Sequence, residues 1–448
     1  MPRIVHFFIL ILISGTTFSQ QGDVNSPFSR FGIGNLNDRG GMHLRQMGGL
    51  GSSYVDQFHL NFENPATLSF LNSTAFDVGL EMQRSSITDQ ENTSSLWSGN
   101  LSYLSLGFPL RNPLNKANDA VFGNQEYKFN WGMGFNLAPI STISYDINRV
   151  DSLENVGSFN RNFVGSGGFW KATWGNAVNY KNFALGLNIG YLFGKSEFSR
   201  NIDFVDEITA FDNVFSREYN ARGFYWDFGA IYNIYLNKAD LADKNTITEP
   251  KLLTIGITGK SATGLNLETN INEINVLVAS AFDVLVDTVN ISSGIEGNGT
   301  MPGELGIGAT YYHSNKFGIG FDIKRTFWSQ YENDANPEEL DNTTRIAIGG
   351  FLRPDYRSTE SFLKRVNYRF GFYMEDDPRV IESRSINNIG VTFGFGLPFA
   401  WQRKFSNLNL GFNIGRRAVD DILSETFFKI HMGFTFNDNE WFIKRKYN

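Results

Sequence analysis

The sequence of 448 residues contains no cysteine. That absence excludes a disulfide framework, a thiolate metal site and a cysteine nucleophile. It also excludes the lipid-anchored N-terminal cysteine of a bacterial lipoprotein. Basic residues are few: 39 Lys and Arg stand against 46 Asp and Glu, which gives a net charge of −7. This balance argues against a nucleic-acid partner that is recognised through a basic surface.

Long apolar runs are absent as well. No segment reaches the run of about 18 apolar residues that marks a transmembrane helix. A chain of this kind enters a membrane only as a closed β-barrel. The abundant residues point the same way, because aromatic residues make up 15% of the chain and 45 residues are Gly. This composition is typical of outer-membrane barrels.

The N-terminal residues follow the order of a secretory signal peptide. Arg3 supplies a positive charge, residues 7–13 form an apolar run, and residues 17–19 place small side chains at the cleavage positions. We therefore expect residues 1–19 to be removed during export. The alternative is a short buried strand or helix at the N-terminus.

The rest of the chain alternates between apolar and small or polar residues with a period of two. Leu185, Leu187 and Ile189, for example, alternate with Gly186 and Asn188. A strand places such residues on opposite faces, whereas a helix would scatter them around its axis. The sequence thus predicts an all-β fold, a transmembrane antiparallel β-barrel of 14 strands. The predicted strands cover residues 74–84, 98–109, 127–137, 182–194, 196–204, 221–237, 250–259, 303–313, 316–326, 343–352, 366–374, 388–398, 405–416 and 425–436.

Loop lengths support an even number of strands. Bacterial barrels alternate long outer loops with short periplasmic turns. The longest predicted connections, residues 138–181 and 260–302, are odd-numbered, whereas tight turns near Gly194, at 313–315 and at 399–404 are even-numbered. A count of about 12 or 16 strands would preserve the same alternation and stays open.

The segment before the first strand, residues 20–73, has no clear strand pattern. Phe, Leu and Met are interspersed among its Gly and Asn residues, which disfavours disorder. We predict that this segment is a plug inside the barrel of residues 74–436, since small inward residues leave room for a plug. Residues 437–448 contain a Lys-Arg-Lys cluster and are expected to form a periplasmic basic tail.

The triplet Asn64, Pro65 and Ala66 resembles the hatch motif of the FadL family of outer-membrane proteins. Residues 29–34 and 47–49, together with the C-terminal stretch, are similar to a Bacteroidota branch of that superfamily, to which PorV-type secretion proteins belong. The resemblance implies a plugged barrel of about 14 strands. It also implies either a transporter or a subunit of a larger complex, since the superfamily contains both.

No catalytic constellation is apparent in the sequence. The Gly-rich segments 306–308 and 318–320 lie in period-two strands, so the helix that a nucleotide-binding motif requires is missing. Lys429 and His431 are predicted to point into the lumen from the last strand, where we expect a polar pair that touches the plug and not a catalytic site. The sequence predicts no enzymatic activity, no metal and no cofactor.

The most apolar stretch outside the predicted strands lies in an outer loop. It includes Val276, Leu277, Phe282 and Leu285. An exposed apolar patch of this kind needs a cover. A ligand, a partner protein or the barrel mouth would serve, and so would neighbouring residues of the loop itself.

Two outer positions are candidates for O-glycosylation. Ser152 and Thr288 each follow an Asp and precede an apolar residue. This pattern resembles the glycosylation motif of Bacteroidota. Chance is an equal explanation for so short a motif.

Two functions compete for a bacterial outer-membrane barrel of this kind, and both rank above a hydrolase at the barrel rim. The sequence favours a docking or accessory subunit of a larger outer-membrane machine, for barrel assembly or protein secretion, because the inward residues are mainly Gly, Asn, Thr, Asp and Lys. The alternative is a FadL-like gated channel for hydrophobic small molecules or long-chain fatty acids. The expected partners are membrane lipid, other outer-membrane or periplasmic proteins, or a hydrophobic ligand.

Overall fold

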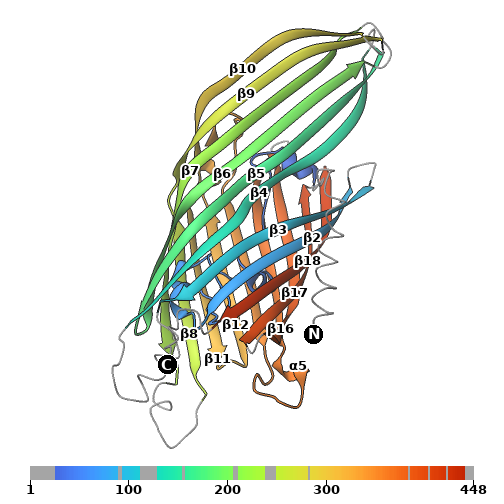
Figure 1. The fold of residues 1–448 in the computed structure, drawn as a ribbon. Helices are drawn as coiled ribbons and strands as arrows, with labels where there is room; N and C mark the ends of the chain where they lie inside the picture. Colours follow the sequence, from blue (N-terminus) through green and yellow to red (C-terminus); the bar gives the residue numbers. More distant parts are fainter. Residues whose placement is uncertain are drawn as a thin grey trace, which may run out of the picture.

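The computed structural model describes residues 26–88, 93–110, 129–153, 157–204, 210–237, 249–280, 283–381, 384–401, 404–419 and 422–438. The predicted signal peptide and most of the predicted basic tail lie outside these residues. Closed antiparallel pairing of 14 strands forms a barrel (Figure 1). These strands are β2 (Thr74–Thr88), β3 (Thr93–Pro109), β4 (Phe129–Leu153), β5 (Gly157–Tyr180), β6 (Phe183–Phe204), β7 (Asp212–Tyr235), β8 (Lys251–Lys260), β11 (Glu304–His313), β12 (Phe317–Thr326), β14 (Thr343–Leu352), β15 (Asn367–Ile381), β16 (Arg384–Trp401), β17 (Lys404–Val419) and β18 (Leu423–Asp438).

The barrel closes where β18 pairs with β2, from Ser424 opposite Thr88 to Asp438 opposite Thr74. Alternation along the strands follows the predicted period of two. Leu185 is 52% exposed on the outer face of β6, whereas Asn188 is 1% exposed on its inner face. The predicted fold class and strand number are therefore confirmed. The helices of the described part are short, and none could cross a membrane.

The strand number is right, but two of the strand assignments are wrong. Residues 138–181 are not a loop, because β4 continues to Leu153 and β5 pairs with it along its whole length. The predicted strands 182–194 and 196–204 are one strand, β6, and Gly194 lies opposite Phe169 within the sheet instead of in a turn. The two errors cancel in the count. Alternation is weak in the first half of β5 because this half rises beyond the rest of the barrel (Figure 1), where neither face has to meet lipid.

Residues 260–302 were also predicted to be a loop, and they form a hairpin of β9 (Thr263–Ser280) and β10 (Asp283–Met301). Strand β7 pairs with β9 as far as Gly223 and with β8 from Phe228 onward. The hairpin therefore continues the sheet beyond the barrel. Figure 1 shows β9 and β10 beside the upper parts of β4 to β7, and we call this region the extended sheet.

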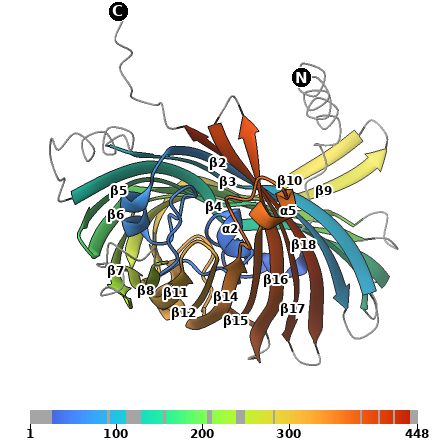
Figure 2. The same cartoon turned by 90° about the horizontal axis from the view of Figure 1, so that it is seen from below.

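The N-terminal residues 26–73, which we call the lumen segment, lie within the ring of strands (Figure 2). Their short elements are η2 (Pro27–Arg30), β1 (Asn35–Leu36), α2 (Met42–Arg45) and η3 (Pro65–Phe70). Met42, Leu44, Met47 and Leu50 are each 0% exposed. These apolar side chains are removed from water by the barrel wall, which stabilises the segment in place. The remaining short elements are β13 (Glu332–Asn333), η4 (Trp328–Gln330) and α5 (Phe362–Arg365).

Glycine in the barrel wall permits the lumen segment to approach closely. A Cβ atom at Gly256 of β8 would lie 1.8 Å from the carbonyl oxygen of Ser52, and one at Gly132 of β4 would lie 1.9 Å from that of Leu68. Both distances are far below van der Waals contact. Small inward residues are thus required by the backbone that packs against them.

Polar inward residues satisfy the backbone of the same segment. The Asp322 carboxylate accepts hydrogen bonds from the backbone N–H groups of Gly51 and Ser52, each at 2.7 Å. The Asn188 side chain donates to the carbonyl of Phe62 at 3.1 Å. A buried irregular segment cannot satisfy all of its own backbone groups, so the wall has to supply partners.

Candidate functional site

A cavity of about 110 Å³ remains between the lumen segment and the barrel wall. The lumen segment forms one side of it, and the other lining residues come from β3, β4, β5, β7, β8, β10, β11 and η4. Its lining includes Asp38, Arg39, Arg45, Glu63, Tyr103, Ser105, Asn136, Ile140, Lys171, Tyr225, Asp227, Lys260, Met301, Glu304 and Trp328. The cavity is therefore rich in charge, although apolar groups form part of its wall.

One group of cavity charges is arranged in close ion pairs. Arg39 of the lumen segment pairs with Glu304 at the start of β11. Lys324 of β12 lies 2.5 Å from Glu63 of the lumen segment. Burial alone would raise the pKa of Glu63, but the nearby cations, Lys324 first among them, outweigh burial and lower this pKa to about 2. These pairs fasten the lumen segment to the wall.

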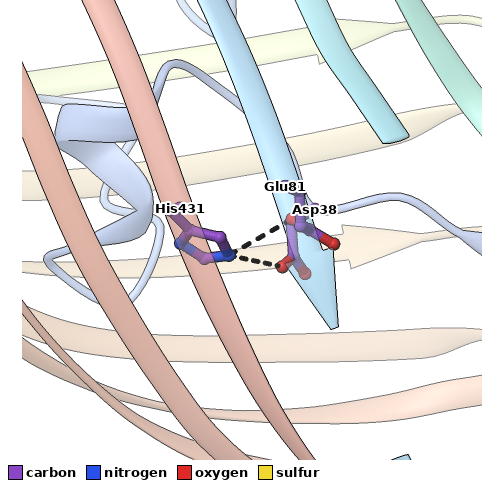
Figure 3. A group of neighbouring side chains, drawn as sticks. All are labelled: Asp38, Glu81 and His431. Carbon is purple, nitrogen blue, oxygen red and sulfur yellow. Dashed lines mark ion pairs between the residues drawn. The ribbon is translucent and has the colours of Figure 1, made fainter. Parts of the chain in front are cut away.

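A second group of charges lies beside β18 and β2 (Figure 3). His431 Nε2 is 3.2 Å from a carboxylate oxygen of Glu81 and 3.7 Å from one of Asp38. An imidazole and two carboxylates are a donor set that suits a divalent metal. The Lys429 ammonium, however, lies 2.9 Å from Asp38, and the Arg45 guanidinium lies 2.8 Å from Glu81. Lys429 and Arg45 balance the two carboxylates, and these ion pairs fasten the lumen segment to the wall; we call this arrangement the latch.

The latch contains two residues that the sequence predicted to point into the lumen. Lys429 and His431 do point into the lumen, and both contact Asp38 of the lumen segment. Burial would raise the pKa of Asp38, but the charges of Lys429, Arg45 and His431 together outweigh burial, so this pKa is lowered. Asp38 was not recognised in the sequence, because the lumen segment shows no periodicity that would have indicated which way its side chains point.

Lys171 of β5 and Lys260 of β8 differ from the other cations of the cavity. The Lys171 ammonium donates to the Tyr225 hydroxyl at 3.3 Å. Its nitrogen lies 5.0 Å from the centre of the Tyr225 ring, and that of Lys260 lies 5.7 Å from it. Within the described residues, neither ammonium has a carboxylate oxygen within 4.0 Å. Asp227, the nearest acid on β7, instead accepts a hydrogen bond from Asn188 at 2.7 Å.

The triplet Asn64, Pro65 and Ala66 forms the start of η3. Asn64 is 0% exposed, and its side-chain oxygen accepts a hydrogen bond from the Ala66 N–H at 3.1 Å. It is the N-cap of η3, and Pro65 takes the first position, where its missing N–H costs nothing. The Asn64 amide also donates to the carbonyls of Ser52 and Ala230. The motif thus joins the lumen segment to β7.

The predicted outer apolar group belongs to the hairpin of the extended sheet. Leu277 of β9 lies opposite Leu285 of β10 in the register. Val276 and Leu277 are half-buried. Phe282 lies outside the described residues. The group is therefore part of a sheet and not of a loop, because strand pairing continues well above the barrel.

The two candidate glycosylation positions also lie in strands of the extended sheet. Ser152 in β4 and Thr288 in β10 are both exposed. Asp151, beside Ser152, pairs with Arg149 at 2.9 Å and with Arg161. Their modification stays a prediction.

Strands β3 and β4 pair over only part of their length. Their register runs from Leu104 opposite Leu137 to Pro109 opposite Gly132. Above these pairs the described residues of the two strands are not joined, and β1 of the lumen segment pairs instead with Ser141 of β4. We call the boundary between β3 and β4 the seam.

The wall at the seam is one residue thick between the cavity and an outer groove. Ser105 of β3 and Asn136 of β4 line both of them. Their side chains are hydrogen-bonded to each other at 2.7 Å. The groove itself is apolar and faces the lipid side of β3 to β6, and its lining includes Leu106, Phe135, Leu137, Trp174 and Ile189.

A family model named BamG matches residues 1–448 of this chain. The chain belongs to the BamG family. No curated protein matches it. The closed barrel identifies this BamG-family member as a bacterial outer-membrane protein. Membership of a Bacteroidota branch and likeness to PorV stay predictions.

Solved structures similar to this BamG-family chain are FadL-type barrels. The CymD monoaromatic hydrocarbon channel has a TM-score of 0.53 and 13% identity, over 91% of this chain and 98% of that chain. The Pseudomonas putida toluene transporter TodX has a TM-score of 0.53 and 16% identity, over 91% and 100%. A Pseudomonas aeruginosa FadL homologue has a TM-score of 0.52 and 11% identity, over 93% and 100%. Identities this low concern the fold alone; CymD is named as a channel and TodX as a transporter.

Proposed function

We propose that this protein is a non-enzymatic channel that passes small hydrophobic molecules between the barrel lumen and the membrane through the seam. The observation that carries the proposal is the wall at Ser105 and Asn136, which separates the cavity from the apolar outer groove. Likeness of fold to proteins named as hydrocarbon channels supports it.

This proposal adopts the alternative of the sequence analysis, because the comparisons support a channel better than a docking subunit. The polar inward residues had argued against a hydrophobic path. In the structure, Asn188, Asp322 and others like them are hydrogen-bonded to the lumen segment. Their polarity therefore reflects the backbone that they hold, and it carries no information about a ligand that passes beside it.

In this proposal the lumen segment is a plug that stays in place. Ion pairs at Glu63 and Asp38 fasten it on two sides of the cavity. Withdrawal of the segment would leave those buried charges without partners, which is costly. Opening the seam requires fewer changes, because few pairs join β3 to β4. We therefore place the gate at the seam.

A reversible cross-link tests the gate. Ser105 and Asn136 lie opposite each other in the register, and the chain has no native cysteine, so the double variant Ser105→Cys/Asn136→Cys allows one disulfide across the seam. We expect oxidation to abolish uptake of toluene into proteoliposomes and reduction to restore it. The control is Ile307→Cys/Ile323→Cys, which joins β11 to β12 and should leave uptake unchanged. Uptake that persists in the oxidised seam variant, with the disulfide verified by mass spectrometry, would contradict the gate.

A second candidate function is the docking subunit of a barrel-assembly machine. The BamG family name favours it. The extended sheet offers a surface, since Val286, Val289 and Ile291 are 57%, 54% and 64% exposed. A tagged chain would be isolated in mild detergent, with Val289→Asp/Ile291→Asp as the variant. A stoichiometric partner that is lost in the variant would support docking. If the wild-type chain is isolated without a partner, docking is contradicted and only the channel proposal stands.

A further inference from the structure

The cavity contains two cations without acidic partners. Lys171 and Lys260 both approach Tyr225, and no described carboxylate oxygen lies within 4.0 Å of either ammonium. The other cations of the lining, Arg39 and Arg45, are paired with Glu304 and Glu81. These two lysines thus lie together beside Tyr225 without a close ion pair to a described carboxylate.

A charged group inside a protein is costly unless it is paired. The Asp227 carboxylate forms no close ion pair with either lysine among the described residues, and it is hydrogen-bonded to Asn188 and Tyr225 instead. The cavity beside the two lysines leaves about 110 Å³ unfilled by the protein. Two ammonium groups that face such a space provide donors for an anion from outside.

A third donor borders the same cavity. Trp328 of η4 is 2% exposed, and its indole N–H has no hydrogen-bond partner among the described residues. Buried indole N–H groups are normally paired, because an unpaired buried donor destabilises the folded protein. The Trp328 side chain therefore independently indicates that an acceptor enters this space.

The rest of the lining indicates which kind of anionic molecule would fit the cavity. Ile140, Met301 and Phe62 give the cavity apolar walls. A ligand that meets both the lysines and these walls has an anionic end and an apolar end. The size matters too, since a cavity of ~150 Å³ is large enough for benzene. The space here, about 110 Å³, is somewhat smaller, so a ligand with a single ring would fill it completely, and a long aliphatic chain would not fit inside it.

We propose that this cavity binds a small amphipathic carboxylate. The carboxylate is held by the ammonium groups of Lys171 and Lys260 and by the indole N–H of Trp328, and the apolar end lies against Ile140 and Met301. As a statement about what the channel carries, this inference rests on the proposed function. As a statement about binding, it stands independently of transport.

Binding is measured on the full-length protein in detergent, by calorimetry with benzoate, benzamide and acetate. Benzamide keeps the shape of benzoate without its charge, and acetate keeps the charge without the ring. We expect benzoate to bind at least tenfold more tightly than either, since hydrogen bonds to charged groups contribute about 1.5–3 kcal/mol. Equal binding of benzoate and benzamide would overturn the role of the lysines, and equal binding of benzoate and acetate would overturn the apolar end.

Variants identify the residues. Lys171→Gln/Lys260→Gln should weaken benzoate binding roughly tenfold or more and leave benzamide unchanged. Lys364→Gln, which alters an exposed lysine on α5, is the matched control and should bind as wild type. Heat-modifiable migration in electrophoresis verifies that each barrel is folded. If the double variant does not fold, Trp328→Phe, which removes only the indole N–H, should still weaken benzoate binding by a few-fold. Wild-type affinity in a folded variant would overturn the site.

The outcomes for the site and for the channel are separable. Selective benzoate binding without seam-dependent uptake would support the binding site and contradict the channel. Seam-dependent uptake of toluene without selectivity for benzoate would support the channel and contradict the binding site.

Discussion

The two sides of the lumen differ in whether their cations form close ion pairs with carboxylates; we call cations that do so matched. Beside β18 and β2, Lys429 and Arg45 each contact a carboxylate, and the lumen segment is latched there through Asp38. Beside β5 and β8, Lys171 and Lys260 approach Tyr225, and no described carboxylate oxygen lies within 4.0 Å of either ammonium. Matched charges hold the protein's own chain, whereas unmatched charges can bind something else. The contrast assigns a structural role to the first side and a binding role to the second.

Removal of one cation from each side should change the stability of the barrel by very different amounts. Lys429→Met leaves Asp38 and Glu81 short of a partner, so we expect a loss of about 3–5 kcal/mol of stability, as for a broken buried ion pair. Lys260→Met removes a charge that has no carboxylate to leave behind, so we expect a change within about 1 kcal/mol. The temperature of barrel unfolding in detergent measures both. Similar losses in the two variants would remove the distinction between the sides.

Acid should weaken the attachment of the lumen segment to the barrel wall at Glu63. Because the pKa of Glu63 is lowered from its usual 4.5 to about 2 in the folded protein, its charge stabilises the fold fully above pH 4.5. That contribution, about 1–3 kcal/mol, is lost as pH falls through about 2. We expect pepsin to cleave within the lumen segment increasingly as pH falls from 4.5 toward 2.

Two variants sharpen this acid test. The Glu63→Gln variant has no carboxylate at this position to protonate, so its cleavage should depend less steeply on pH than that of wild type. Glu360→Gln, at an exposed position, should behave as wild type. Mass spectrometry locates the cuts. An unchanged pH profile in Glu63→Gln would show that this ion pair does not hold the segment.

The smallest effect is expected at Tyr225. Tyr225→Phe keeps the ring beside both lysines and removes the hydroxyl that accepts from Lys171. The hydroxyl positions the Lys171 ammonium but is not a donor to the ligand in the proposed site, so benzoate binding should change by no more than roughly fivefold, about 1 kcal/mol. A loss as large as that of Lys171→Gln/Lys260→Gln would mean that Tyr225, and not the pair of lysines, dominates the unmatched side.

Much of the barrel could be predicted because lipid imposes a local rule. Residues such as Leu185 and Leu187 face hydrocarbon and have to be apolar at every second position, so the pattern identifies the strand. The rule ends where the strands leave the membrane. β5, β9 and β10 were missed for that reason, since pairing continues above the barrel without an apolar requirement.

The site was less accessible to sequence reasoning. Asn64, Pro65 and Ala66 were recognised through a resemblance, and Lys429 and His431 through alternation. Arg39 and Glu304 form a pair although they are 265 positions apart in the chain. No local pattern relates such residues. Lys171 was hidden inside a segment that had been interpreted as a loop.

The sequence by itself determined that this chain is an outer-membrane barrel and which side of most strands faces lipid, because alternation is a property of neighbouring residues. Only the tertiary structure decided which inward residues meet one another. Closure of the sheet and the path of residues 26–73 through the lumen bring Asp38 to Lys429 and Glu63 to Lys324. Within the described residues, they leave the ammonium groups of Lys171 and Lys260 without a carboxylate oxygen within 4.0 Å. Charge matching depends on distances across the lumen, and those distances exist only after the barrel has closed.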